Sequence, residues 1–192
     1  MAAISVSKKS ILELTKSGIK DSKLLSPKKR QSLFGHIINI AESICICRIG
    51  IEDIDFHVFK NNLNLLEAEA MAITIGNMKS DKTYVDSCDV NPSRYQRTIL
   101  GFLGQHDTRI VSMHHADRLN VAVSGASIIA KVIRDSEISK IRVQYGDIGS
   151  GYPSDKKTIR FVRDWYSQKN EIPPFARKSW KPAQLIVSGT NT

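Results

Sequence analysis

The sequence predicts an α/β fold in which short strands alternate with helices. Two aspartates, Asp86 and Asp117, each stand at the end of a short β-branched or apolar run (83–85 and 110–113), and a segment with helical periodicity follows each one. From residue 44 onward, strand-like and helix-like segments continue to alternate, which is the pattern of a mostly parallel sheet covered by helices. At 192 residues, the chain is long enough for one domain with a substantial core.

The elements of the first half are predicted from apolar spacing and from helix-starting residues. Ser26 can cap a helix and Pro27 fits its first turn, and an apolar stripe follows them. The predicted elements are a strand over 2–6, a short amphipathic helix over 9–16, a helix from 26 to about 42, a strand over 44–49 and a helix over 64–78.

The elements of the second half are predicted from the same kinds of signal. Asn91 and Pro92 open a helix after the Asp86 strand, and a long apolar stripe follows the Asp117 strand. The predicted elements are strands ending at 86 and 113, helices over 91–103, 121–145 and 156–168, a glycine-rich loop over 146–155 and a short C-terminal helix after a Pro-Pro break. The strands are few for a chain of this length.

The chain is strongly basic, with a net charge of +9 from 28 Lys and Arg against 19 Asp and Glu. This surplus favours a polyanionic partner such as nucleic acid, although many basic proteins bind none. No apolar stretch approaches the roughly 20 residues of a membrane span, and no secretory signal opens the chain. We therefore expect a soluble cytoplasmic protein without a membrane partner. Cys45, Cys47 and Cys88 have neither metal-ligand nor disulfide spacing, so we expect buried, reduced thiols.

Asp86 and Asp117 are the candidate metal ligands. Strand ends of an open α/β sheet converge on a crevice, and two acids there make half of an oxygen-ligand site for Mg²⁺ or Mn²⁺. Either residue alone could instead cap the helix that follows it. The pair in a strongly basic protein favours metal chemistry on a phosphate substrate.

Several motifs occur in an order that spans nearly the whole chain. They are Gly18-Ile-Lys-Asp-Ser-Lys-Leu-Leu-Ser-Pro27, Asn64-Leu-Leu-Glu-Ala-Glu69, Tyr84-Val-Asp-Ser-Cys-Asp-Val90, His114-His-Ala-Asp117, Ser124-Gly-Ala-Ser-Ile-Ile-Ala-Lys-Val-Ile-Arg-Asp135, Tyr145-Gly-Asp-Ile-Gly-Ser-Gly-Tyr-Pro-Ser-Asp155 and Pro173-Pro-Phe-Ala-Arg-Lys-Ser-Trp180. Their order and their residues resemble those of ribonuclease HII, and specifically its archaeal branch. The resemblance implies a ribonuclease H-like mixed sheet flanked by helices, with a C-terminal helical extension. It also implies a two-metal endonuclease of replication and repair that leaves 5′-phosphates. Its substrates would be RNA–DNA hybrids and duplex DNA with embedded ribonucleotides.

The resemblance also implies roles for individual residues. Asp86 and Asp117 would be metal carboxylates, and Tyr152 would sense the ribose 2′-hydroxyl, although a tyrosine in a glycine-rich loop can also be a packed anchor. Asp135 borders the family's site and is either a catalytic acid or the partner of a helix ion pair with Arg134 or Lys131. The candidate phosphate contacts, each of which could instead be a solvated surface charge, are Lys23, Arg177 and Lys178.

The chain departs from the family at its start, because the opening Asp-Glu-Ala-Gly-Arg-Gly run, which supplies two more metal carboxylates, does not occur. We expect a start-site error or a fragment rather than a working variant. We expect a monomer with a catalytic part over 1–146 and a substrate-binding loop and helical extension over 147–192. The alternatives are a non-catalytic nucleic-acid-binding remnant and a nuclease of the same fold with another substrate. Gly125, where the family usually has alanine, costs about 1 kcal/mol of helix propensity.

Overall fold

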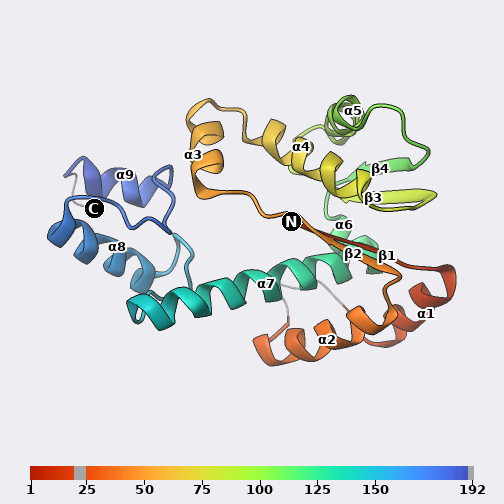
Figure 1. The fold of residues 1–192 in the computed structure, drawn as a ribbon, viewed down its shortest axis with the longest axis horizontal. Helices are drawn as coiled ribbons and strands as arrows, with labels where there is room; N and C mark the ends of the chain where they lie inside the picture. Colours follow the sequence, from red (N-terminus) through yellow and green to blue (C-terminus); the bar gives the residue numbers. More distant parts are fainter. Residues whose placement is uncertain (20–24, 190–192) are drawn as a thin grey trace. The chain divides into compact units, whose positions relative to one another are not determined.

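The computed structural model describes residues 1–19 and 25–189, and these ranges form short strands interleaved with helices (Figure 1). The elements are β1 (Ala2–Ser5), α1 (Lys8–Lys16), α2 (Pro27–Ile40), β2 (Ser43–Ile46), α3 (Ile51–Phe59), α4 (Leu63–Gly76), β3 (Lys82–Asp86), α5 (Pro92–Leu103), β4 (Arg109–Met113), α6 (Ala116–Leu119), α7 (Val121–Tyr145), α8 (Lys156–Lys169) and α9 (Lys181–Val187). The α/β class is confirmed. Within the described ranges, no helix has the length and apolar character that a bilayer crossing requires.

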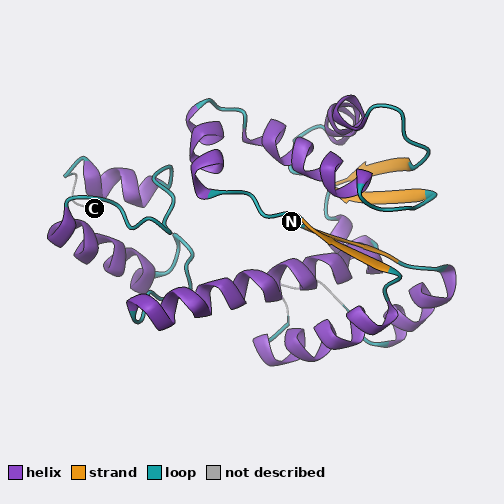
Figure 2. Cartoon of the chain, in the orientation of Figure 1, coloured by secondary structure: helices purple, strands orange, loops and turns teal. Residues whose placement is uncertain are grey.

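The described strands pair as two separate two-stranded sheets (Figure 2). β1 and β2 are antiparallel, with Ala2 opposite Ile46, whereas β3 and β4 are parallel, with Asp86 opposite Met113. The parallel prediction therefore holds for the pair that ends at Asp86, whereas Asp117 lies beyond β4, in α6. One described sheet is antiparallel and the other is parallel. The parallel pair requires a crossover between its strands, and α5 supplies it.

The predicted local helix signals are confirmed at two helix starts. The Ser26 hydroxyl accepts a hydrogen bond from the Lys29 amide at 3.2 Å, and the Asn91 side chain accepts one from the Arg94 amide at 3.0 Å. Asp155 caps α8 in the same way. Two helices were not predicted, α3 and α6. Both are short, and neither has a side-chain cap that the sequence would reveal.

The chain divides into two compact units. Unit 1 consists of Met1–Arg48 and Asn64–Ile133, and unit 2 consists of Ile49–Leu63 and Arg134–Thr192. The second boundary falls inside α7, after Ile133. The expected functional division after residue 146 concerns roles along the sequence and stays a prediction.

Unit 1 has two hydrophobic clusters. In the first, Ala68 and Ala72 of α4 and Ile99 of α5 pack on Val85 and Ile110 of the parallel strands. The small alanines let the α4 backbone lie close to the sheet. The second cluster joins α1, α2 and α7 beside β1 and β2, and its fully buried members are Leu14, Ile37, Ile128 and Ile129. Each buried Leu or Ile contributes about 1.5–3 kcal/mol relative to an exposed one, so these contacts hold the strand ends in place.

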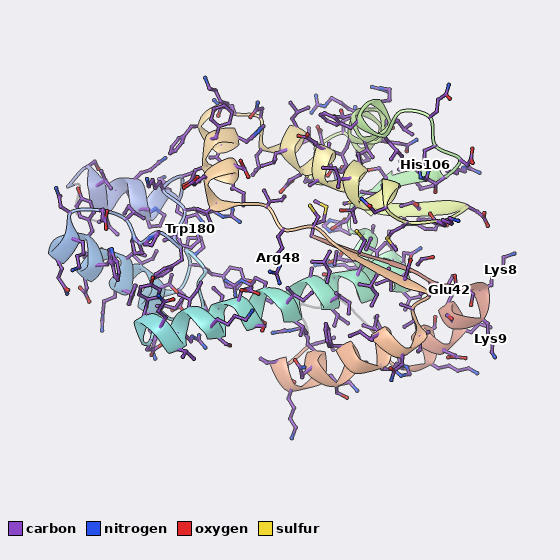
Figure 3. All side chains as sticks on the ribbon, in the orientation of Figure 1. Lys8, Lys9, Glu42, Arg48, His106 and Trp180 are labelled. Atoms are coloured by element: carbon purple, nitrogen blue, oxygen red, sulfur yellow. The ribbon has the colours of Figure 1, made fainter. Side chains whose placement is uncertain are left out.

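Unit 2 is built around α8 and α9. Val162, Ile172, Ala176 and Ala183 form its buried cluster, with Trp180 at the start of α9 packed against it (Figure 3). A set of aromatic rings on α7, α8 and the following loop adds to this core, with ring centroids 4.6–6.1 Å apart: Tyr145, Phe161, Trp165 and Phe175.

Candidate active site

Asp86 is the last residue of β3, and the parallel pairing fixes its position. The neighbouring Val85 side chain points into the core, so Asp86 points the other way and is exposed. The Ser87 amide continues the ladder by donating to the Met113 carbonyl at 2.9 Å. Both strands thus end at the same edge of the sheet, which is the edge where Asp86 lies.

A hydrogen bond joins Asp86 to the turn that carries Asp117. One carboxylate oxygen, Oδ1 of Asp86, accepts from the Ala116 amide at 2.9 Å, and Ala116 is the first residue of α6. The alternative that Asp86 caps a helix is therefore partly right. Asp86 caps α6, across the sheet edge, and not the helix that follows it in sequence. The contact places Asp86 beside the residue that precedes Asp117.

Asp117 is held more rigidly than Asp86. It lies in the first turn of α6, only 6% of its surface is exposed, and its carbonyl oxygen accepts a hydrogen bond from the Ser124 hydroxyl of α7. His115 makes the turn into α6 with a left-handed backbone (φ 55). Since α6 also packs against β3, the two candidate metal ligands are brought to one edge of unit 1.

A network of polar side chains surrounds the start of the loop after Asp86. Loss of hydration, together with the neighbouring Glu67 carboxylate, raises the pKa of the Cys88 thiol to about 12. Burial, followed by the contact with Cys88, raises the pKa of Tyr95. All three cysteines are free thiols as expected, but the prediction that they are buried was wrong: Cys88 is exposed and Cys45 and Cys47 are half-buried. A thiol with so high a pKa is a poor nucleophile and metal ligand.

Asp89 stabilises the same loop. Its carboxylate accepts from the Asn91 amide at 2.8 Å and from two nitrogens of Arg94 at 2.9 and 2.6 Å. The hydrogen bonds from Arg94 and Asn91 lower the pKa of Asp89 below its usual value. Asp89 therefore orders the turn between β3 and α5.

The donor set at this edge fits a hard divalent cation. Asp86 and Asp117 offer carboxylate oxygens, which Mg²⁺ and Mn²⁺ prefer. Among the residues that the structure describes, however, no group of three or more His, Cys, Asp or Glu side chains is arranged to hold a metal ion. Asp86 and Asp117 stay the candidate ligands at this edge.

In unit 2, the predicted loop over 146–155 carries Tyr152, which is 40% exposed. The Asp155 carboxylate accepts from the Ser150 amide at 2.6 Å, and hydrogen bonds of this kind lower its pKa to about 2. The Thr158 hydroxyl donates to the Ile148 carbonyl at 3.0 Å, and Arg142 donates to the Gly149 carbonyl at 3.0 Å. The backbone on both sides of the tyrosine is therefore fixed.

Arg134 lies directly beside this tyrosine. The carbon of its guanidinium group is 3.8 Å from the centroid of the Tyr152 ring, and Nη2 donates to the Gly151 carbonyl at 2.8 Å. Nη1 pairs with the Asp135 carboxylate at 3.1 Å. The helix ion pair expected of Asp135 is therefore present, whereas a catalytic role for Asp135 stays a prediction.

The candidate phosphate contacts differ in what surrounds them. Arg177 is half-buried and Lys178 is exposed, and both lie in the loop before α9. The buried Asp55 of α3 holds this loop by accepting from the Lys178 and Ser179 amides at 2.8 and 3.0 Å. Lys23 lies outside the described residues. Sequence reasoning missed Asp55 because its partners are more than 120 positions away along the chain.

Comparison with known proteins places these motifs in one family. The family model for ribonuclease HII matches residues 1–183. The chain belongs to the ribonuclease HII family. A ribonuclease HII from Cenarchaeum symbiosum is 43% identical over 189 residues, which cover 98% of this chain and 90% of that relative. The family's endonuclease activity, its ribonuclease H-like fold and its dependence on divalent metal ions extend to this chain.

Two solved structures support the same conclusion for the fold. The crystal structure of ribonuclease H2 from Pyrococcus horikoshii matches with a TM-score of 0.87 and 37% identity, over 96% of this chain and 87% of that one. The structure of a PCNA:RNase HII complex from Archaeoglobus fulgidus matches with a TM-score of 0.83 and 34% identity, over 96% and 86%. Family membership argues against the expected alternative of a nuclease with an unrelated substrate.

Proposed function

We propose that Asp86 and Asp117 hold the divalent ions of this ribonuclease HII, which are Mg²⁺ or Mn²⁺. The observation that carries the proposal is the hydrogen bond from Ala116 to Asp86, because it fixes one acid beside the other at the end of the parallel strands. The Asp86 Oδ1 that accepts this bond has its orientation set, which leaves Oδ2 to face an ion.

The substrates we propose are the RNA strand of RNA–DNA hybrids and single ribonucleotides embedded in duplex DNA. Divalent ions held by Asp86 and Asp117 would supply an activated water and stabilise the leaving oxygen. The protein side chains would orient these ions. Asp117, buried and tied to α7 through its backbone, keeps its carboxylate in one place. Asp86 has more freedom, because its side chain is exposed.

Residues outside this edge bind the nucleic acid in our proposal. Tyr152 senses the 2′-hydroxyl, which is the group that distinguishes RNA from DNA. Arg177, Lys178 and Lys23 contact phosphates, which fix the register without reading the sequence. Exposed lysines such as Lys8 and Lys9, which extend from α1 (Figure 3), add to the net positive charge that attracts a polyanion. We expect the protein to act as a monomer in the cytoplasm.

The number of acids supports a second candidate function. Holding two ions requires more protein carboxylates than the two at this edge. If no other acid completes the site, the chain binds nucleic acid without cutting it. The residues that the structure describes contain no larger cluster of metal-binding side chains, and this observation supports the second function.

The experiment compares Asp86→Asn with Asp81→Asn, a control that removes the same charge from an exposed residue just before the other end of β3. Single-turnover cleavage of an RNA–DNA hybrid in Mn²⁺ and the melting temperature are measured for both, in this chain and in a version extended by the family's Asp-Glu-Ala-Gly-Arg-Gly motif. We expect Asp86→Asn to reduce turnover of the extended version by several orders of magnitude with little effect on melting. Near-normal cleavage by Asp86→Asn would remove Asp86 from the mechanism.

A further inference from the structure

The Tyr152 ring is held by more than its own loop. The Arg134 guanidinium carbon lies 3.8 Å from the ring centroid, which is close enough for a stacked cation–π contact. The ring is 40% exposed, so it combines a fixed neighbour with access to solvent. A side chain that must meet one sugar hydroxyl needs this combination.

Arg134 is itself fixed at three points. One terminal nitrogen donates to the Gly151 carbonyl at 2.8 Å, the other pairs with Asp135 at 3.1 Å, and the plane of the group faces the tyrosine. The planar fork of arginine can make these contacts together, whereas the point charge of a lysine cannot. The side chain therefore links α7 to both the backbone and the ring of the Tyr152 loop.

The backbone before Tyr152 has little room to move against α7. Gly151 has a positive φ of 70, and a Cβ added there would come within 2.5 Å of Ile138 Cδ1 and 3.0 Å of Arg134 Nη2. Only glycine fits this close approach without strain. Asp155 and Thr158 hold the same loop from the side of α8, so its backbone is fixed from both helices.

We propose that Arg134 is a positioning residue that sets the orientation of Tyr152 and thereby strengthens discrimination between a ribonucleotide and a deoxyribonucleotide. The proposal rests on the role of Tyr152 in the proposed function. Arg134 acts through the tyrosine and not on the phosphate that is cleaved. Asp135 then has a role in this assembly as well, because it holds the second nitrogen of the arginine.

The test uses Arg134→Lys, which keeps the charge opposite Asp135 but removes the planar fork. Arg142→Lys is the matched control, because Arg142 lies on the same helix and anchors the same loop at the Gly149 carbonyl, before the tyrosine. Both changes are also made in a Tyr152→Ala background. The first readout is the ratio of dissociation constants for an all-DNA duplex and the same duplex with one ribonucleotide, measured in EDTA so that no strand is cut.

The second readout is the ring signal of Tyr152 in NMR spectra of protein with ¹³C-labelled tyrosine, assigned from its absence in Tyr152→Phe. A cation–π contact of this kind corresponds to about a two- to five-fold change in affinity. We expect Arg134→Lys to shift the ring signal and to reduce the discrimination ratio by about that factor. We expect no further loss when it is added to Tyr152→Ala, and a smaller effect of Arg142→Lys.

Four results would overturn the proposal. An unchanged ring signal in Arg134→Lys would show that the arginine does not position the tyrosine. Equal losses in Arg134→Lys and Arg142→Lys would reduce Arg134 to a general loop anchor. If Tyr152→Ala leaves the ratio unchanged, the sensing role of Tyr152 fails and the proposal fails with it. If Tyr152→Ala lowers the ratio and Arg134→Lys does not, the inference about Arg134 alone is wrong.

Discussion

Removing the Asp55 carboxylate should destabilise unit 2 through a loop far away in the sequence. Asp55 is 7% exposed and accepts from the Lys178 and Ser179 amides at 2.8 and 3.0 Å. A hydrogen bond to a charged group contributes about 1.5–3 kcal/mol, and water can replace part of this at an exposed residue such as Lys178. We therefore expect Asp55→Ala to lower the free energy of unfolding by about 2–4 kcal/mol.

Asp55→Asn should cost less than Asp55→Ala, because the amide keeps one acceptor oxygen for the two backbone donors. Asp53→Asn, a change at an exposed residue of the same helix, is the control and should stay within about 0.5 kcal/mol. Urea unfolding followed by circular dichroism measures all three. A cost below about 1 kcal/mol for Asp55→Ala would refute the reasoning, since two backbone donors would then have lost a buried charged acceptor at almost no expense.

Three further predictions concern helix packing, acid stability and activity. Gly35→Ala, in an open position of α2, should stabilise the protein by about 1 kcal/mol in thermal unfolding. Gly125→Ala should stabilise it clearly less, because the added Cβ would lie 2.9 Å from Ile4 Cδ1. Equal gains in stability would contradict this packing. Hydrogen bonds from Ser150 and Lys157 lower the pKa of Asp155 from 3.8 to about 2. The stability that Asp155 contributes is therefore present above pH 4 and is lost as the pH falls towards 2. An Asp155→Asn variant whose acid unfolding curve has the same shape would disprove this. On an RNA–DNA hybrid over a range of Mn²⁺ concentrations, the chain should cleave only when the metal is present, and Asp117→Asn should reduce cleavage strongly, because its carboxylate would hold an ion; near-normal cleavage by Asp117→Asn would remove Asp117 from the site.

The sequence predicts those elements whose signals are local. The caps at Ser26 and Asn91 and the alternation of apolar residues indicate most helices and the strands that end at Asp86 and Met113, and the structure agrees. Asp117 lies beyond its strand, in the first turn of α6. The α3 helix escaped prediction because the contacts of its buried Asp55 come from the far end of the chain. An isolated stretch of nine residues gives little helical signal of its own.

The same distinction applies to the candidate site. The strand-end position of Asp86 is visible in the sequence, but its hydrogen bond to Ala116 spans 30 residues and requires the parallel register. The stack of Arg134 on Tyr152 likewise joins a helix to a loop through the left-handed turn at Gly151. Contacts of this kind depend on tertiary structure, and no periodicity or spacing in the sequence encodes them.

The most direct test of the proposed metal edge is a titration of the ¹⁵N-labelled chain with Mn²⁺, followed by NMR. A bound Mn²⁺ ion broadens the signals of nearby amides and requires no turnover. The account predicts that broadening at low Mn²⁺ centres on residues 86–87 and 116–118, that Mg²⁺ reverses it, and that Asp86→Asn abolishes it while Asp81→Asn leaves it intact. Broadening centred elsewhere, or unchanged broadening in Asp86→Asn, would contradict the assignment of Asp86 and Asp117 as the metal ligands.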